Sequence, residues 1–197
     1  MERTEDDEAR RDDALPRFQA IYEAHYAAVV AYVRRRTRVP ADAQDAVAET
    51  FTTAWRRVAE VPEGDAGRAW LYGVARRVLA NQRRGDRRRT GLTIRLRSED
   101  EGAVDVEGPV LAADDRRIVL AALARLREAD REILRLAVWE ELPHREIGAV
   151  LGCAESAVAV RLHRARNRLA REIGKEERRA GQETSESPGR RAEGSTS

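Results

Sequence analysis

Apolar residues recur at helical spacing along most of the chain. Apolar side chains three or four positions apart occur within residues 18–33, 47–58, 70–78, 133–138 and 147–169. This period predicts amphipathic helices. Pro40 can open one of them, because a proline in the first turn loses no hydrogen bond there. Ala, Leu and Arg abound, and all three are good helix formers. The pattern therefore predicts an all-α fold.

Charge divides the chain into blocks. Residues 1–15 are acidic and are expected to fray, whereas residues 98–115, SEDEGAVDVEGPVLAADD, are acidic and have no helical period. An aperiodic acidic stretch between two periodic halves is typical of a linker. We therefore expect two small helical domains, 16–90 and 116–173, joined by a flexible linker over 91–115. Residues 174–197 are expected to form a disordered tail.

Residues 143–166, PHREIGAVLGCAESAVAVRLHRAR, predict a helix-turn-helix. Gly152 suits the left-handed position that ends a helix, and the apolar side chains on both sides of it can lock two helices at a steep angle. The outer face of the second helix then carries Glu155, Ser156, Val160, Arg161, His163 and Arg164. Such a helix fits the major groove of DNA, and its arginines can pair with phosphates, as can Arg168. A plain helical hairpin with a solvated basic face remains the alternative.

Composition excludes several classes of function. Charged residues make up 37% of the chain and the net charge is only +2, with Lys175 as the sole lysine. Cys153 is the sole cysteine, so no internal disulfide can form, and the three histidines show no zinc-ligand spacing. We find no phosphate-binding glycine loop and no nucleophile motif. Neither a signal peptide nor a membrane-length apolar run is apparent. We expect a soluble, cytoplasmic, non-enzymatic protein without metal or cofactor.

The C-terminal half resembles a known family. Residues 122–169 are similar to region 4 of the sigma-70 family in its extracytoplasmic-function (ECF) branch, with Glu146-Ile147, Leu151-Gly152 and the run 161–166, RLHRAR, in place. In that family this domain reads the promoter −35 element. Two positions depart from the pattern, because the family often has Ser where Ala154 stands and a basic residue where Ala159 stands. A serine there would cap the second helix.

Residues 41–58, ADAQDAVAETFTTAWRRV, resemble region 2.2 of the same family. The resemblance implies that this helix binds a coiled coil on the largest subunit of core RNA polymerase. The matching candidates are Asp45, Glu49, Phe51 and Trp55. Asp45 and Glu49 are four apart and share one helix face, and an acidic face suits a basic partner helix. The family's usual glutamine is Ala48 here. Without the resemblance, a solvated helix face would be the plainer interpretation.

Residues 68–89, RAWLYGVARRVLANQRRGDRRR, resemble regions 2.3 and 2.4, which open and read the −10 element. The candidates for DNA contact are Tyr72, Arg76, Arg77, Asn81, Gln82, Arg83 and Arg84. The arginines can bind phosphates and the two amides can pair with base edges. Capture of an unstacked base requires an aromatic or polar pocket. Trp70 lies on the apolar stripe and is expected in the core, whereas Tyr72 lies off it and is expected to be the freer aromatic.

The resemblance thus implies a sigma factor that binds core RNA polymerase, recognises promoter DNA and melts it. Such proteins are commonly held inactive by an anti-sigma factor. The alternative is a helix-turn-helix regulator that binds duplex DNA but not polymerase. That class usually carries a ligand or phosphoacceptor domain, and this chain shows no alternation of strands and helices that would form one.

Overall fold

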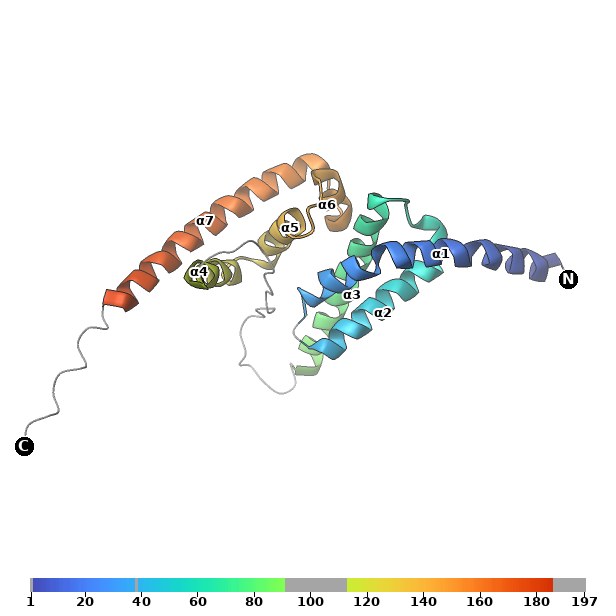
Figure 1. Cartoon of the computed structure of the whole chain (residues 1–197), viewed down its shortest axis with the longest axis horizontal. Coiled ribbons are helices and arrows are strands. Elements are labelled where there is room, and N and C mark those ends of the chain that lie inside the picture. Colours follow the sequence, from blue (N-terminus) through green and yellow to red (C-terminus); the bar gives the residue numbers. More distant parts are fainter. Residues whose placement is uncertain (1, 38, 91–112, 186–197) are drawn as a thin grey trace, which may run out of the picture.

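The computed structural model describes residues 2–37, 39–90 and 113–185, and the side chains of residues 14–37, 39–86 and 115–182 (Figure 1). This part of the chain is helical throughout, which confirms the all-α prediction. The elements are α1 (Glu2–Arg34), α2 (Pro40–Arg56), the short 3-10 helix η1 (Val58–Glu60), α3 (Asp65–Thr90), α4 (Ala113–Ala124), α5 (Glu128–Val138), α6 (His144–Leu151) and α7 (Glu155–Ser185). No helix in the described ranges is both long enough and apolar enough to cross a membrane.

Two helices extend beyond their expected bounds. Helix α1 begins at Glu2, where the sequence predicted a frayed terminus, and contains Pro16. Helix α7 continues to Ser185, although a disordered tail was expected from residue 174. Its C-terminal part packs beside α4, and Arg125, the residue after α4, pairs with Glu176 of α7 at 2.9 Å. This tertiary contact extends a helix that sequence periodicity alone would have ended earlier. The expected linker falls almost wholly outside the described residues.

The first half of the chain forms a three-helix bundle of α1, α2 and α3. Pro40 occupies the first turn of α2, as predicted. Val33 of α1, Phe51 of α2 and Leu71 of α3 are buried in the shared core. Helix α3 packs against α1 and α2, and also against α6 of the other half. A helix with three neighbouring helices must bury side chains on more than one face. Aromatic residues of α3 can therefore be buried on a face other than its apolar stripe.

The second half contains α4 to α7. Ile133 of α5, Ile147 of α6 and Leu162 of α7 are almost fully buried. Arg131 is also buried, and its guanidinium donates to the carbonyl oxygens of Leu123, Ala124 and Leu126 at 2.8–3.1 Å. These carbonyls lie at the C-terminal end of α4, where backbone oxygens lack helical partners and favour a cation. Arg131 thereby joins α4 to α5.

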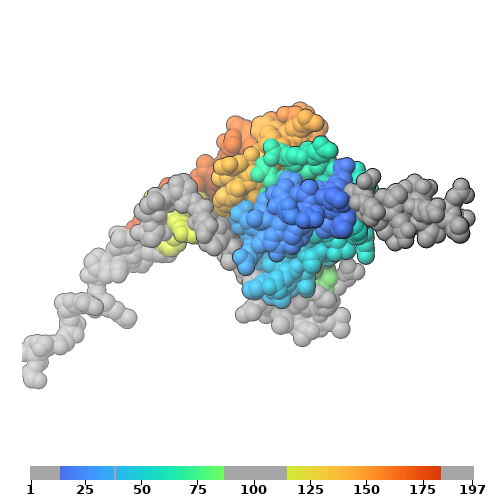
Figure 2. Space-filling view, turned by 45° about the vertical axis from the view of Figure 1, so that its right-hand side comes forward, coloured from blue at the N-terminus to red at the C-terminus, as the bar shows by residue number. Residues whose placement is uncertain are grey.

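The two halves are docked against each other through α3 and α6 (Figures 1 and 2). A Cβ atom placed on Gly73 of α3 would lie 3.8 Å from the Cα atom of Val150 of α6, so the two backbones approach closely. Buried residues of both halves belong to one continuous apolar cluster. The sequence predicted two domains joined only by a flexible linker. The structure adds an apolar core that the two halves share.

A buried ion-pair network lies beside the apolar contact. Arg36 Nε lies 2.9 Å from Glu132 Oε2, and Arg36 Nη1 lies 2.9 Å from Glu140 Oε1. The Tyr32 hydroxyl donates to Glu132 at 3.0 Å, and Arg35 pairs with Glu140 at 2.6 Å. Burial opposes ionisation of Glu132, but the charge of Arg36 and the hydrogen bonds outweigh it and lower the pKa of the carboxyl group. The network therefore links the end of α1 to α5 and its following loop.

Candidate functional site

The predicted helix-turn-helix is formed by α6, a tight turn and α7. Gly152 ends α6 in the left-handed conformation, with φ 67° and ψ 42°, and the Cys153 N–H donates to the Gly148 carbonyl at 3.0 Å. Val158 and Leu162 of α7 are 0% and 2% exposed. They pack in the core with the apolar residues of α6, as the sequence predicted. This packing holds the two helices and leaves the opposite face of α7 free.

That opposite face is the candidate DNA-reading surface. The six residues predicted for it are all exposed, namely Glu155, Ser156, Val160, Arg161, His163 and Arg164. Within the described ranges, the structure records no ion pair for Arg161 or Arg164. Both guanidinium groups are therefore available to an external anion. The His163 ring lies 3.0 Å from the Asn167 amide nitrogen, one turn further along the helix.

Arg168 departs from the expectation that it contacts phosphates. Its Nη1 atom lies 2.7 Å from both carboxylate oxygens of Asp130 in α5. The side chain thus fastens α7 to α5 instead of extending the basic face. Sequence spacing could not distinguish these two roles, since Asp130 lies 38 positions away.

The acidic face of α2 lies on the opposite part of the molecule. Asp45 and Glu49 are exposed, and Trp55, one to two turns further on, is 39% exposed. Phe51 is only 5% exposed, because its ring packs against Tyr22 at 4.8 Å between ring centroids. Phe51 therefore supports this surface from beneath, as its place in the apolar stripe of residues 47–58 predicted, and its contact with polymerase stays a prediction.

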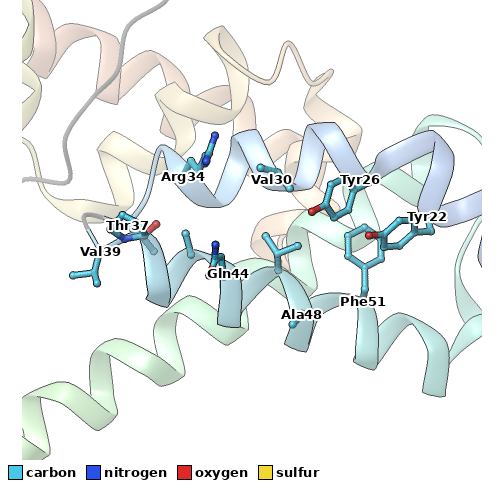
Figure 3. Close-up of a pocket in the computed structure, with 12 residues that line it drawn as sticks. Tyr22, Tyr26, Val30, Arg34, Thr37, Val39, Gln44, Ala48 and Phe51 are labelled. Carbon is cyan, nitrogen blue, oxygen red and sulfur yellow. The ribbon is translucent and has the colours of Figure 1, made fainter.

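A groove of about 500 Å³ runs between α1 and α2 beside this face (Figure 3). Tyr22, Tyr26 and Phe51 gather at one end of it, and Arg34 and Val39 lie toward the other (Figure 3). Gln44 and Ala48 of α2 also line the groove and are exposed. Asp45 and Glu49 do not line the groove, but they are next in sequence to Gln44 and Ala48, which do.

The basic side of α3 is the third candidate surface. Arg76, Arg77, Asn81 and Arg84 are exposed, while Gln82 and Arg83 are half-buried. The Asn81 side-chain oxygen accepts a hydrogen bond from Arg84. Arg83 lies 3.0 Å from Glu128 of the second half and donates to the Arg36 carbonyl at 3.2 Å. Docking of the halves therefore occupies one of the predicted DNA-contacting arginines.

Tyr72, one of the two aromatic residues of α3, lies opposite to the prediction. Tyr72 is 2% exposed and stacks on Tyr32 of α1, with ring centroids 4.5 Å apart. Burial raises the pKa of its hydroxyl to about 12. Trp70 was expected in the core; it packs against the core but is only half-buried, with the Arg57 guanidinium 5.5 Å from its ring centroid. Tyr72 is buried although it lies off the apolar stripe of α3, because α3 packs against α1 and α6 as well as α2.

Two family matches cover most of the described chain. Residues 21–89 match Sigma-70 region 2, and residues 116–169 match Sigma-70, region 4. The chain is also 33% identical over 150 residues to the ECF RNA polymerase sigma factor SigL of Mycobacterium tuberculosis, covering 74% of this chain and 82% of that protein. The chain belongs to the ECF branch of the sigma-70 family. It is therefore a non-enzymatic sigma factor that directs promoter recognition by RNA polymerase.

Other known proteins resemble this sigma factor in sequence or in fold. The ECF RNA polymerase sigma factor BldN of Streptomyces coelicolor is 30% identical over 173 residues, which cover 87% of this chain and 64% of BldN. The sigma factor RpoE of Bartonella quintana, solved with the anti-sigma factor NepR, has a TM-score of 0.60 at 23% identity and covers 80% of this chain and 96% of its own. CnrH, solved with the cytosolic domain of CnrY, has a TM-score of 0.53 at 20% identity and covers 80% and 88%. These structures support the fold.

The sigma factor contains interdomain residues that sequence analysis missed. Arg36, Glu132 and Glu140 are all at most 5% exposed, although charged residues are rarely buried. The sequence around them does not mark them as buried, because Arg36 stands in the basic run 34–38, RRRTR, and each glutamate has a second charged residue beside it. Sequence spacing could not pair them either, because the partners lie about a hundred positions apart.

Proposed function

We propose that three exposed faces of this sigma factor divide the work of promoter recognition. Helix α2 binds core RNA polymerase, α3 engages the −10 element and α7 reads the −35 element. The observation that carries the proposal is that each predicted contact surface lies on a separate helix, with most of its polar side chains exposed. The faces follow the order of the matched family regions along the chain.

The α2 face suits a basic helical partner. Asp45 and Glu49 supply two adjacent negative charges, and Trp55, further along the helix, offers a partly exposed aromatic anchor. Charge complementarity at such a surface sets register and association rate more than affinity, while an aromatic anchor supplies binding energy. We infer that the partner is the coiled coil on the largest subunit of core polymerase, as the family resemblance implies.

The α3 face supplies backbone contacts for the −10 element. Arg76, Arg77 and Arg84 are exposed and can neutralise phosphates, and Asn81 has an amide suited to base edges. Tyr72 cannot stack on an unpaired base, since it is enclosed between helices. We therefore infer that base capture during melting belongs to residues 60–68, which precede the exposed part of α3.

An anti-sigma partner is the regulatory proposal. The similar fold of RpoE was solved with the anti-sigma factor NepR bound, and that of CnrH with the cytosolic domain of CnrY. We extend this to the present chain, whose aromatic groove between α1 and α2 adjoins the polymerase face. Since polymerase and promoter DNA would be its working partners, we place the protein in the cytoplasm with the nucleoid.

A binding and transcription assay tests the proposal. Wild-type protein is expected to be retained on immobilised core polymerase and to direct initiation from specific promoters. The double variant Asp45→Arg/Glu49→Arg is expected to lose retention, because it reverses the charge of the α2 face. Asp115→Arg/Glu177→Arg is the matched control, since it makes the same charge change at exposed positions of α4 and α7.

Three results would contradict the proposal. Negligible retention of the wild type would favour the alternative, a DNA-binding regulator that does not bind polymerase. Equal retention of the wild type and the Asp45→Arg/Glu49→Arg variant would place the polymerase contact elsewhere. Salt-independent or absent DNA affinity would exclude both DNA-binding functions, because phosphate contacts make affinity fall steeply with salt.

A further inference from the structure

Val160 is an apolar side chain in the centre of the outer face of α7. It is 50% exposed, whereas Val158 and Leu162 on the same helix are almost completely buried. At about 100° per residue, Val160 points roughly 160° away from both of them. Ser156 and Arg164, one turn before and one turn after it, are also exposed. Val160 therefore contributes nothing to the core and stands between two polar residues of the candidate DNA-reading surface.

A valine at this position limits what the helix can recognise. Its side chain neither donates nor accepts a hydrogen bond. Among the base edges of the major groove, the apolar feature is the 5-methyl group of thymine. Ala159 beside it is also exposed and adds a second small apolar surface. The chemistry of this patch fits a methyl group and does not fit a phosphate or a base amide.

The surroundings of Val160 indicate that its partner is DNA. Arg161 is its neighbour in sequence and Arg164 lies one turn away, and the described part of the chain offers neither an ion-pair partner. The two guanidinium groups lie to one side of Val160 on the helix and can bind the phosphates that border the groove. With the helix held in this way, Val160 beside them is directed toward the base edges.

We propose that Val160 reads a thymine of the −35 element through its 5-methyl group. The inference rests on the proposed function, because it requires that α7 enters the major groove at that element. Enclosing one methyl group between apolar atoms changes affinity by about fourfold. This is a modest but measurable preference, and it is confined to one base pair.

The test uses the full-length protein with core polymerase and a promoter identified by transcript-start mapping. Each thymine of the −35 element, on either strand, is replaced in turn by deoxyuridine, which lacks only the 5-methyl group. Open-complex formation by the wild type is expected to fall about fourfold at one position. Val160→Ala is expected to lose about the same factor on the unmodified promoter and to treat thymine and uracil alike at that position.

Val138→Ala is the matched control. Val138 is 60% exposed on α5, and its replacement removes the same side-chain atoms away from the recognition helix. Alanine has the higher helix propensity, so both variants are expected to fold. The control should keep the thymine preference of the wild type.

The outcomes separate the inference from the proposed function. If the wild type ignores every uracil replacement, or if Val160→Ala keeps the thymine preference, the inference is overturned while promoter recognition stands. If no promoter supports initiation by this protein, the proposed function and the inference both fall.

Discussion

The interdomain network makes Arg36→Ala the most informative single substitution. The Arg36 side chain is 2% exposed and contacts carboxylates from two segments of the other half. Its removal leaves Glu132 with the Tyr32 hydroxyl and Glu140 with Arg35. Removing one partner of a buried ion pair costs about 3–5 kcal/mol. Since both carboxylates keep one donor, we expect about 3 kcal/mol, the lower end of that range. This corresponds to roughly a hundredfold weaker docking.

Docking can be measured directly by small-angle X-ray scattering and by thermal unfolding. The variant is expected to have a larger radius of gyration than the wild type and to unfold in two separated transitions. Arg57→Ala is the control, because Arg57 forms an ion pair with Glu60 that is exposed on both sides. It should leave docking unchanged. An Arg36→Ala protein as compact and as stable as the wild type would refute the structural reasoning.

The same network predicts a dependence on pH. The pKa of Glu132 is lower in the folded protein than the ordinary value of about 4.3 for glutamate. The ionised Glu132 therefore contributes fully to the stability of the docked state when the pH is above that ordinary value. This stability is lost as the pH falls through the folded pKa. Wild-type docking should weaken in acid, and scattering measured across this range would show the transition. Docking that stays constant down to strongly acidic pH would contradict the role of Glu132.

Three further substitutions test local features by thermal unfolding. Arg135→Met is expected to raise the free energy of unfolding. Nε and Nη2 of Arg135 are buried without a hydrogen-bond partner in the described part of the chain, and burial lowers the pKa of the guanidinium to about 10. A lower unfolding midpoint than that of the wild type would contradict this. Gly148→Ala should lower the free energy of unfolding by about 1–3 kcal/mol, since its Cβ would lie 2.6 Å from the Cys153 carbonyl oxygen. An unchanged unfolding midpoint would show that the turn relaxes freely. Ala154→Ser should raise the free energy of unfolding by about 1 kcal/mol by capping α7, which begins at the next residue. An unchanged unfolding midpoint would mean that the hydroxyl does not reach the free N–H groups of the first turn.

Much of the candidate site could be predicted because its signals are local. The turn at Gly152, the buried pair Val158 and Leu162, and the exposed face of α7 all follow from spacing within one or two turns. The faces of α2 and α3 were predicted in the same way for their charged residues. The prediction failed where a side chain had more than one neighbouring helix to face, as for Tyr72. Helical periodicity identifies an apolar stripe but not the number of partners that cover it.

The sequence by itself determined the all-helical composition, the helix-turn-helix and the family of this protein. These features depend on residues close together in the chain, whose helical spacing and turn preferences act regardless of the rest. Only the tertiary structure decided that the two halves dock, that Arg168 binds Asp130 and that Arg83 binds Glu128. The Tyr32–Glu132 hydrogen bond joins residues a hundred positions apart. The physical reason is that such pairs form only after particular helix faces meet, and burial then makes each unpaired charge costly enough to select its partner.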